Sequence, residues 1–275
     1  MPPASHAKAI RHRATWPHIL WSGFLLFSLS LFALETTGNP NLFPTVTMLG
    51  TFLIPITYVV FLYDHQSLSS LTPLGLALGF VYGGVLGVSA AAMLEPLFIH
   101  HLAFSTAFIV GFAEEFAKLL GVIALGWRMK NKSEINGILL GAAAGMGFAS
   151  LESSGYAFTA FLLSHGNIDA VVNIMLMRGL LSPLGHGTWT AILAGVLFHE
   201  SKNGRFRLTF NLVKAYILVS ILHGLWDSLP TLLSTLPVTG LDFFAGEAIV
   251  GGIGLAILWM RWEEAKKRQK QEEMP

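Results

Sequence analysis

The sequence predicts an all-α, polytopic membrane protein: a bundle of about eight transmembrane helices with both termini in the cytoplasm. Three observations predict this fold class. The 275-residue chain is 53% hydrophobic and only 12% charged, whereas an ordinary soluble domain carries roughly 25% charged residues. Apolar runs long enough to cross a bilayer follow one another along the chain. The lysines and arginines of the segments that connect the spans gather on one side of the resulting topology.

Each transmembrane helix needs roughly 20 mostly apolar residues, and polar, proline or glycine clusters mark the breaks between such runs. We expect the first run to be a retained span, because it is long for the core of a signal peptide and lacks a small-residue cleavage site. The sixth run contains Arg178, Pro183 and His186, so it scores weakly as a lipid-facing span; proline and polar groups are tolerated in a span where neighbouring helices satisfy them. The eight runs are 16–34, 44–63, 73–94, 103–127, 137–163, 177–199, 209–232 and 241–260.

Basic residues set the predicted orientation. They lie in the N-terminal segment and in segments 128–132, 202–207 and 266–268, whereas the connections on the opposite side contain no lysine or arginine. Because basic loops stay in the cytoplasm, eight spans put both termini there. We interpret residues 1–275 as one integral membrane domain with a catalytic core at about 103–232 and a polar cytoplasmic tail, 261–275. Within the tail, we expect the mixed-charge segment 263–273 to be a solvated helical extension.

Composition excludes several classes of function. The formal net charge is only +1, and no arginine-rich patch indicates a nucleic-acid partner. The chain contains no cysteine, so disulfides, thiolate metal sites and cysteine nucleophiles are excluded. Carboxylate and imidazole chemistry remain.

Ionisable residues inside four consecutive spans are the candidate functional residues, because each costs several kcal/mol at the bilayer centre unless it is paired. In the fourth span, Glu114 and Lys118 are four residues apart and can form an ion pair, which leaves Glu115 for other work. We expect the second member of each further pair at this spacing to orient or hydrogen-bond the first. These pairs are Glu152 with Tyr156, His186 with Thr190, and His223 with Asp227.

The four candidate groups share one depth. Counted from the cytoplasmic end at about 1.5 Å per residue, Glu115, Glu152, His186 and His223 lie roughly 18 to 23 Å deep. A divalent metal such as Zn²⁺ can be held there by the two imidazoles and one glutamate, while a second glutamate serves as general base. Without metal, a desolvated glutamate can still activate water. The residues alone leave both mechanisms open.

Other polar residues and glycines receive simpler interpretations. Arg178 and Glu95 lie near predicted membrane interfaces, where charge costs little. Glu247 lies deeper in the eighth span without a partner at helical spacing, so structural and functional roles stay equally open. Glycine at every fourth position within 79–87 and 137–145 indicates close helix packing.

Four motifs together resemble the PrsW family of intramembrane proteases. They are Glu-Glu-x-x-Lys at 114–118, Phe-Ala-x-x-Glu at 148–152, His186 followed by Thr190, and His-Gly-Leu-Trp-Asp at 223–227. The resemblance covers about residues 105–230. It implies a multi-pass metallopeptidase of a bacterial cell membrane that cuts a single-span membrane protein, such as an anti-sigma factor. The active-site set that it implies is Glu114, Glu115, Glu152, His186 and His223.

Two further points come from the resemblance. Ser153 stands where the family often has asparagine, which changes the hydrogen bonding next to Glu152. The wider superfamily includes the CAAX prenyl endopeptidases, in which a glutamate-activated water is favoured over a bound metal. The resemblance therefore leaves open whether the site binds zinc or works without a metal.

We predict hydrolysis of a peptide bond in or near the membrane-spanning segment of a membrane protein substrate. Because a helical substrate must unwind to expose its scissile carbonyl, we expect a lateral opening or an extracytoplasmic mouth. A proton-coupled transporter or channel is one alternative, since intramembrane Glu, His and Asp also form proton relays. A non-catalytic scaffold that binds partner helices is another. The predicted roles are Glu114 or Glu115 as base, Lys118 tuning them, Glu152, His186 and His223 holding water or zinc, and Asp227 orienting His223.

Overall fold

The computed structural model describes residues 14–65, 68–99, 104–233 and 242–272. These described ranges are helical and contain no β-strand. The basic N-terminal segment, the first residue of the predicted eighth span and the last three residues lie outside them. The helices are α1 Trp16–Thr37, η1 Pro40–Leu42, α2 Phe43–Asp64, α3 Pro73–Phe98, α4 Phe104–Gly126, α5 Glu134–Leu163, α6 Ile168–Leu181, η2 Pro183–Gly187, α7 Thr188–His199, α8 Phe210–Leu233 and α9 Asp242–Glu272.

Six segments of the described chain are long and apolar enough to cross a membrane. They contain α1, α2, α3, α5, the combined α6–η2–α7 segment and α8. The remaining two predicted spans correspond to α4 and α9. Helix α4 has 23 residues but carries three charges within five positions, and α9 continues from an apolar half into the polar tail. The multi-helix membrane fold is therefore confirmed, and the count of eight spans stays a prediction.

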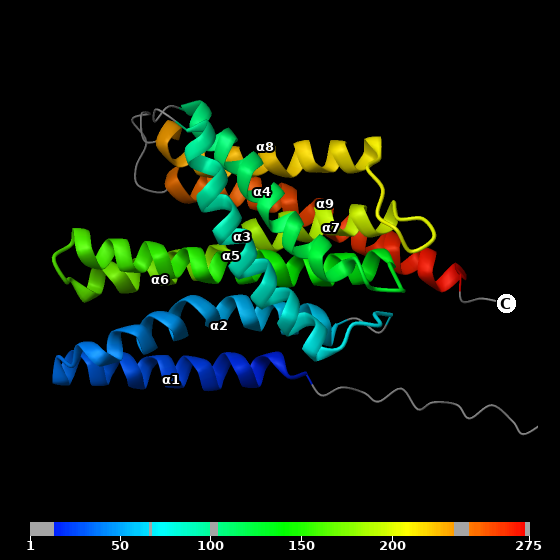
Figure 1. Cartoon of the computed structure of the whole chain (residues 1–275). Coiled ribbons are helices and arrows are strands. Elements are labelled where there is room, and N and C mark those ends of the chain that lie inside the picture. The colour runs from blue at the N-terminus through cyan, green and yellow to red at the C-terminus, as the bar shows by residue number, and fades with distance from the viewer. Residues whose placement is uncertain (1–13, 66–67, 100–103, 234–241, 273–275) are drawn as a thin grey trace, which may run out of the picture.

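Helix α5 is the centre of the bundle. In Figure 1, α1 and α2 lie beneath α5 and α6, while α4, α8 and α9 lie above them. Helix α5 packs against α3 on one side and against η2 and α7 on another. Glycines make these approaches close: a Cβ added at Gly83 would overlap Ala144, and one added at Gly137 would lie 2.7 Å from the Cβ of Phe198. The predicted packing role of both glycine stripes is confirmed.

The sixth predicted span is wrong at its start. We expected a helix over 177–199, but α6 begins at Ile168, because the Asn167 side chain accepts a hydrogen bond from the Ala170 N–H at 3.3 Å and caps it. The segment then breaks at Pro183, which lacks an N–H, and passes through the wide π-helical turn η2 before α7. His186 lies on this turn.

The C-terminal tail is helical as predicted, but it is not simply solvated. Helix α9 continues to Glu272 and packs back onto the bundle through Glu134, the first residue of α5. Arg261 and Arg268 each donate to the Glu134 carboxylate at 2.5 Å, and the Glu134 side chain is only 4% exposed. A buried carboxylate requires such partners, which explains why the tail is held down.

Candidate active site

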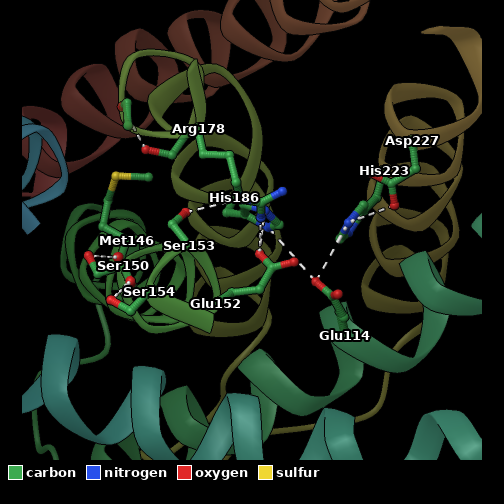
Figure 2. Close-up of polar contacts among 12 residues, drawn as sticks. Glu114, Met146, Ser150, Glu152, Ser153, Ser154, Arg178, His186, His223 and Asp227 are labelled. Carbon is green, nitrogen blue, oxygen red and sulfur yellow. Dashed lines mark hydrogen bonds and ion pairs between the residues drawn. The ribbon is translucent and has the colours of Figure 1, made fainter. Parts of the chain in front are cut away.

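The charged residues of α4, α5, η2 and α8 converge at one point. Figure 2 shows His186 with contacts to both Glu152 and Glu114, and His223 approaching Glu114 from the opposite side. His186 Nε2 lies 3.3 Å from Glu152 Oε2, and His223 Nε2 lies 3.6 Å from Glu114 Oε2. The two imidazole centroids are 5.1 Å apart. The structure thus brings together the residues that the sequence places at a common depth.

Lys118 lies at the enclosed, inner side of this cluster. Its Nζ donates to Glu114 Oε2 at 3.0 Å and to Glu115 Oε1 at 2.8 Å, and it lies 2.8 Å from His186 Nδ1. The predicted pair of Lys118 with Glu114 is present, but Glu115 is not left free, because Lys118 pairs with it as well. Its long side chain reaches both carboxylates because residues three and four apart are both neighbours on a helix.

Glu115 is fully committed to buried partners. Besides Lys118, its Oε1 lies 3.1 Å from His223 Nδ1, and its Oε2 accepts a hydrogen bond from Thr190 Oγ1 at 3.2 Å. Its side chain has no exposed surface. Thr190 therefore orients Glu115 and not His186, contrary to the prediction from spacing. The i, i+4 rule places two residues on one face, but α4 supplies the nearer partner for this hydroxyl.

Asp227 contacts His223 as the spacing predicts. Its Oδ2 lies 3.5 Å from His223 Nε2, which is an ion-pair distance and longer than a hydrogen bond. The Asp227 side chain is 37% exposed while the His223 ring is 2% exposed. Asp227 thus connects the buried imidazole with more open surroundings.

Arg178 is a site residue that our interpretation of the sequence missed. Its Nη2 lies 2.6 Å from Glu152 Oε2, its Nε donates to Ser153 Oγ at 3.1 Å, and its guanidinium stacks 4.0 Å from the Tyr156 ring centroid. Tyr156 therefore packs on Arg178, contrary to the expected pairing with Glu152. The interface assignment of Arg178 was wrong because α6 starts at Ile168, which places Arg178 ten residues inside the helix. The Asn167 cap is the signal that identifies this start.

A cavity of about 510 Å³ opens beside the cluster. On α4 its lining residues run from Thr106 to Glu114, and on α8 they are Trp226 and Asp227. Helix α6 packs on α2 and α5 but makes no extensive packing with α4, α8 or α9 in the described ranges. The cavity occupies this space. Its charged and imidazole lining consists of Glu114, Glu152, Arg178, His186, Asp227 and Glu247.

The donor set fits a divalent metal ion. Glu114, His186 and His223 each offer one ligand atom, and these atoms lie within 4.8 Å of one another. One carboxylate and two imidazoles form a ligand set of catalytic zinc sites that leaves a position for water. This group contains Glu114 in the place that we expected Glu152 to take.

Comparison with known families agrees with this geometry. Residues 72–260 match the model of the PrsW family intramembrane metalloprotease. No curated protein and no solved structure matches the chain. The matched segment covers more than half of the 275 residues and contains every residue of the cluster and all the charged lining of the cavity. The chain therefore belongs to the PrsW family of intramembrane metalloproteases, and it is a membrane protease.

Proposed function

We propose that this protease cuts a single-span membrane protein by activating water at Glu114, His186, His223 and Glu152, with zinc as the metal. The observation that carries the proposal is the meeting of one carboxylate and two imidazoles at a cavity inside an apolar helix bundle. Family membership favours hydrolysis over the transporter and scaffold alternatives.

Glu114, His186 and His223 would hold the metal, which when bound lowers the pKa of a coordinated water and polarises a carbonyl oxygen. Glu115 Oε1 lies 3.1 Å from His223 Nδ1 and fixes the ring through the nitrogen that does not face Glu114, as outer partners of metal-binding histidines do. Asp227 lies 3.5 Å from Nε2, on the side of the ring that would face the metal.

Glu152 acts as general base in this proposal. Its side chain is 18% exposed, against 6% for Glu114 and none for Glu115, so it is the site glutamate that water reaches most easily. Arg178 and His186 hold its Oε2, which leaves Oε1 to take the proton from water and return it to the leaving amine. Glu115, enclosed by Lys118, His223 and Thr190, supports the site without touching substrate.

The substrate reaches this site from the extracytoplasmic half of the membrane. If α4 and α9 also cross the bilayer, the chain has eight spans, and its basic segments place both termini in the cytoplasm. The cavity lining on α4 then precedes Glu114 on the outer side, and that on α8 follows His223 on the same side. The space between α6 and α4 provides a lateral entry. A bacterial cytoplasmic membrane is the expected location.

The test uses purified full-length protein in nanodiscs with single-span reporter proteins. Wild-type protein is expected to cleave a reporter, and a chelator is expected to stop cleavage until zinc is returned. Glu114→Gln removes a ligand, so both bound metal and cleavage fall. Glu152→Gln removes the base, so cleavage falls while metal content, measured by mass spectrometry, stays at the wild-type level.

Glu264→Gln is the matched control, since this glutamate on α9 is 61% exposed and remote from the cavity. The metal assignment fails if cleavage survives removal of all bound metal. The site assignment fails if Glu114→Gln and Glu152→Gln both cleave as fast as the control.

A further inference from the structure

Glu247 is a buried acid that the proposed mechanism does not use. It lies on α9, four residues before Gly251, on the helix face that packs against Leu184 of η2 and Trp226 of α8. The residue is 6% exposed and lines the same cavity as Glu114. Its Oε2 has no hydrogen-bond partner within the described part of the chain. Helix α9 thus contributes to the cavity lining a residue whose buried carboxylate oxygen has no hydrogen-bond partner among the described residues.

The charges around the cavity do not balance. Four carboxylates and one guanidinium line it. Lys118, behind the lining, pairs with Glu114 at 3.0 Å, and Arg178 lies 2.6 Å from Glu152, so among the described residues no lysine or arginine pairs with Asp227 or Glu247. Asp227, Arg178 and Glu247 line the same cavity. A metal at Glu114 would offset charge at the inner end only. An acid without a partner in a buried site is costly, so the outer end of the cavity favours a cation.

The cavity walls indicate which cation fits. Ile174, Met177, Leu181 and Trp226 supply apolar surface beside the acids. Lysine and arginine have an apolar stem and a charged end, so they match a pocket whose lining combines apolar walls with acidic groups. A small hydrated metal ion would make no apolar contact with these walls.

We propose that Glu247 and Asp227 form a subsite that binds a lysine or arginine side chain of the substrate close to the scissile bond. This inference rests on the proposed function, because it assumes that a protein segment enters the cavity. It adds a specificity element from α9, outside the four motifs that hold the cluster.

Binding of a defined probe tests the subsite separately from catalysis. The probes are fluorescent, leucine-rich single-span peptides that carry one lysine at the extracytoplasmic boundary, with otherwise identical glutamine and glutamate versions. Binding is measured with full-length Glu152→Gln protein in nanodiscs of neutral lipid, because this variant lacks the proposed base and leaves the probe uncut. Four peptides, each with the lysine at a different position, sample different registers of the peptide in the cavity. The lysine peptide is expected to bind roughly tenfold or more tightly than the glutamine peptide in at least one position.

Substitutions at Glu247 in that background decide the assignment. Glu247→Gln, which keeps the side-chain shape, is expected to remove the lysine preference, and Glu247→Lys is expected to favour the glutamate peptide. Glu264→Gln on the exposed part of α9 is expected to keep the preference. Equal dissociation constants for the lysine and glutamine peptides at all positions would overturn the proposal, as would a preference that survives Glu247→Gln. Failure of the proposed function shows differently: wild-type protein would then cleave no reporter, whatever the peptides bind.

Discussion

Replacing Gly145 by alanine tests the closest helix approach at the site. Gly145 lies on α5 where η2 crosses it. An added Cβ would overlap the His186 carbonyl oxygen and lie 2.8 Å from the His186 carbonyl carbon and 2.9 Å from Thr190 Oγ1. Ordinary van der Waals contacts are 3.4–4 Å, so η2 has to move away by roughly 1 Å.

This movement is expected to damage catalysis more than stability. Overpacking costs about 1–3 kcal/mol, and alanine in place of glycine in a helix returns about 1 kcal/mol. A 1 Å displacement of a reacting group, however, lowers activity by about 100-fold. We therefore expect Gly145→Ala to fold, to lose stability by at most about 2 kcal/mol, and to cleave a reporter about 100-fold more slowly.

The assay compares kcat/KM and the free energy of unfolding in the same nanodiscs. Gly155→Ala is the control, because Gly155 lies on the same helix and an added Cβ there meets no atom within 4 Å. Its activity is expected to match wild type. Wild-type kcat/KM in Gly145→Ala would refute the reasoning, since it would show that η2 does not need its observed position.

Three further substitutions test other contacts. Lys118→Met leaves two buried carboxylates without their cation, so we expect unfolding to become easier by about 3–5 kcal/mol, and a double variant with Glu115→Gln to recover part of that loss. Thermal unfolding checks this, and equal stability of Lys118→Met and wild type would contradict it. Arg178→Gln is expected to lower kcat roughly 10- to 100-fold with unchanged metal content, because Glu152 loses its orienting partner. Arg178→Lys should restore part of kcat, and loss of metal in Arg178→Gln would disprove a positioning role. Glu134→Ala is expected to free the C-terminal half of α9, with a loss of about 1–3 kcal/mol because its two arginines are partly exposed. Faster hydrogen exchange over 261–272 measures that release, and unchanged exchange would argue against it.

Patterns local to one helix predicted much of the site. The four-residue spacing of His223 and Asp227 is reflected in a 3.5 Å contact, and the common depth of the acids and imidazoles is reflected in their convergence. Both features follow from the regular rise and turn of a helix, which residue numbers encode directly.

Contacts between helices were harder to predict. Thr190 hydrogen-bonds Glu115 on another helix, and Arg178 reaches Glu152 only because α6 starts nine residues earlier than its apolar run. Hydropathy locates apolar stretches but does not detect a polar first turn that is held by an asparagine cap. The partners of a buried polar group depend on which helices are adjacent, and one sequence does not specify that.

The two adjacent glutamates of α4 show why a catalytic site in a membrane needs two kinds of acid. A charged group far from water must be neutralised for the bundle to be stable, and Lys118 does this for Glu115, whose oxygens contact Lys118, His223 and Thr190. A carboxylate whose two oxygens are both engaged by buried partners cannot also bind or activate a substrate. Reactive acids therefore have to lie where pairing is incomplete and some water enters, as Glu152 at 18% exposure does. Glu247 lines the same cavity, and its buried Oε2 has no hydrogen-bond partner among the described residues. The enclosed acids thus fix the helices in place, while the acids along the cavity retain the unsatisfied charge that a substrate segment can meet.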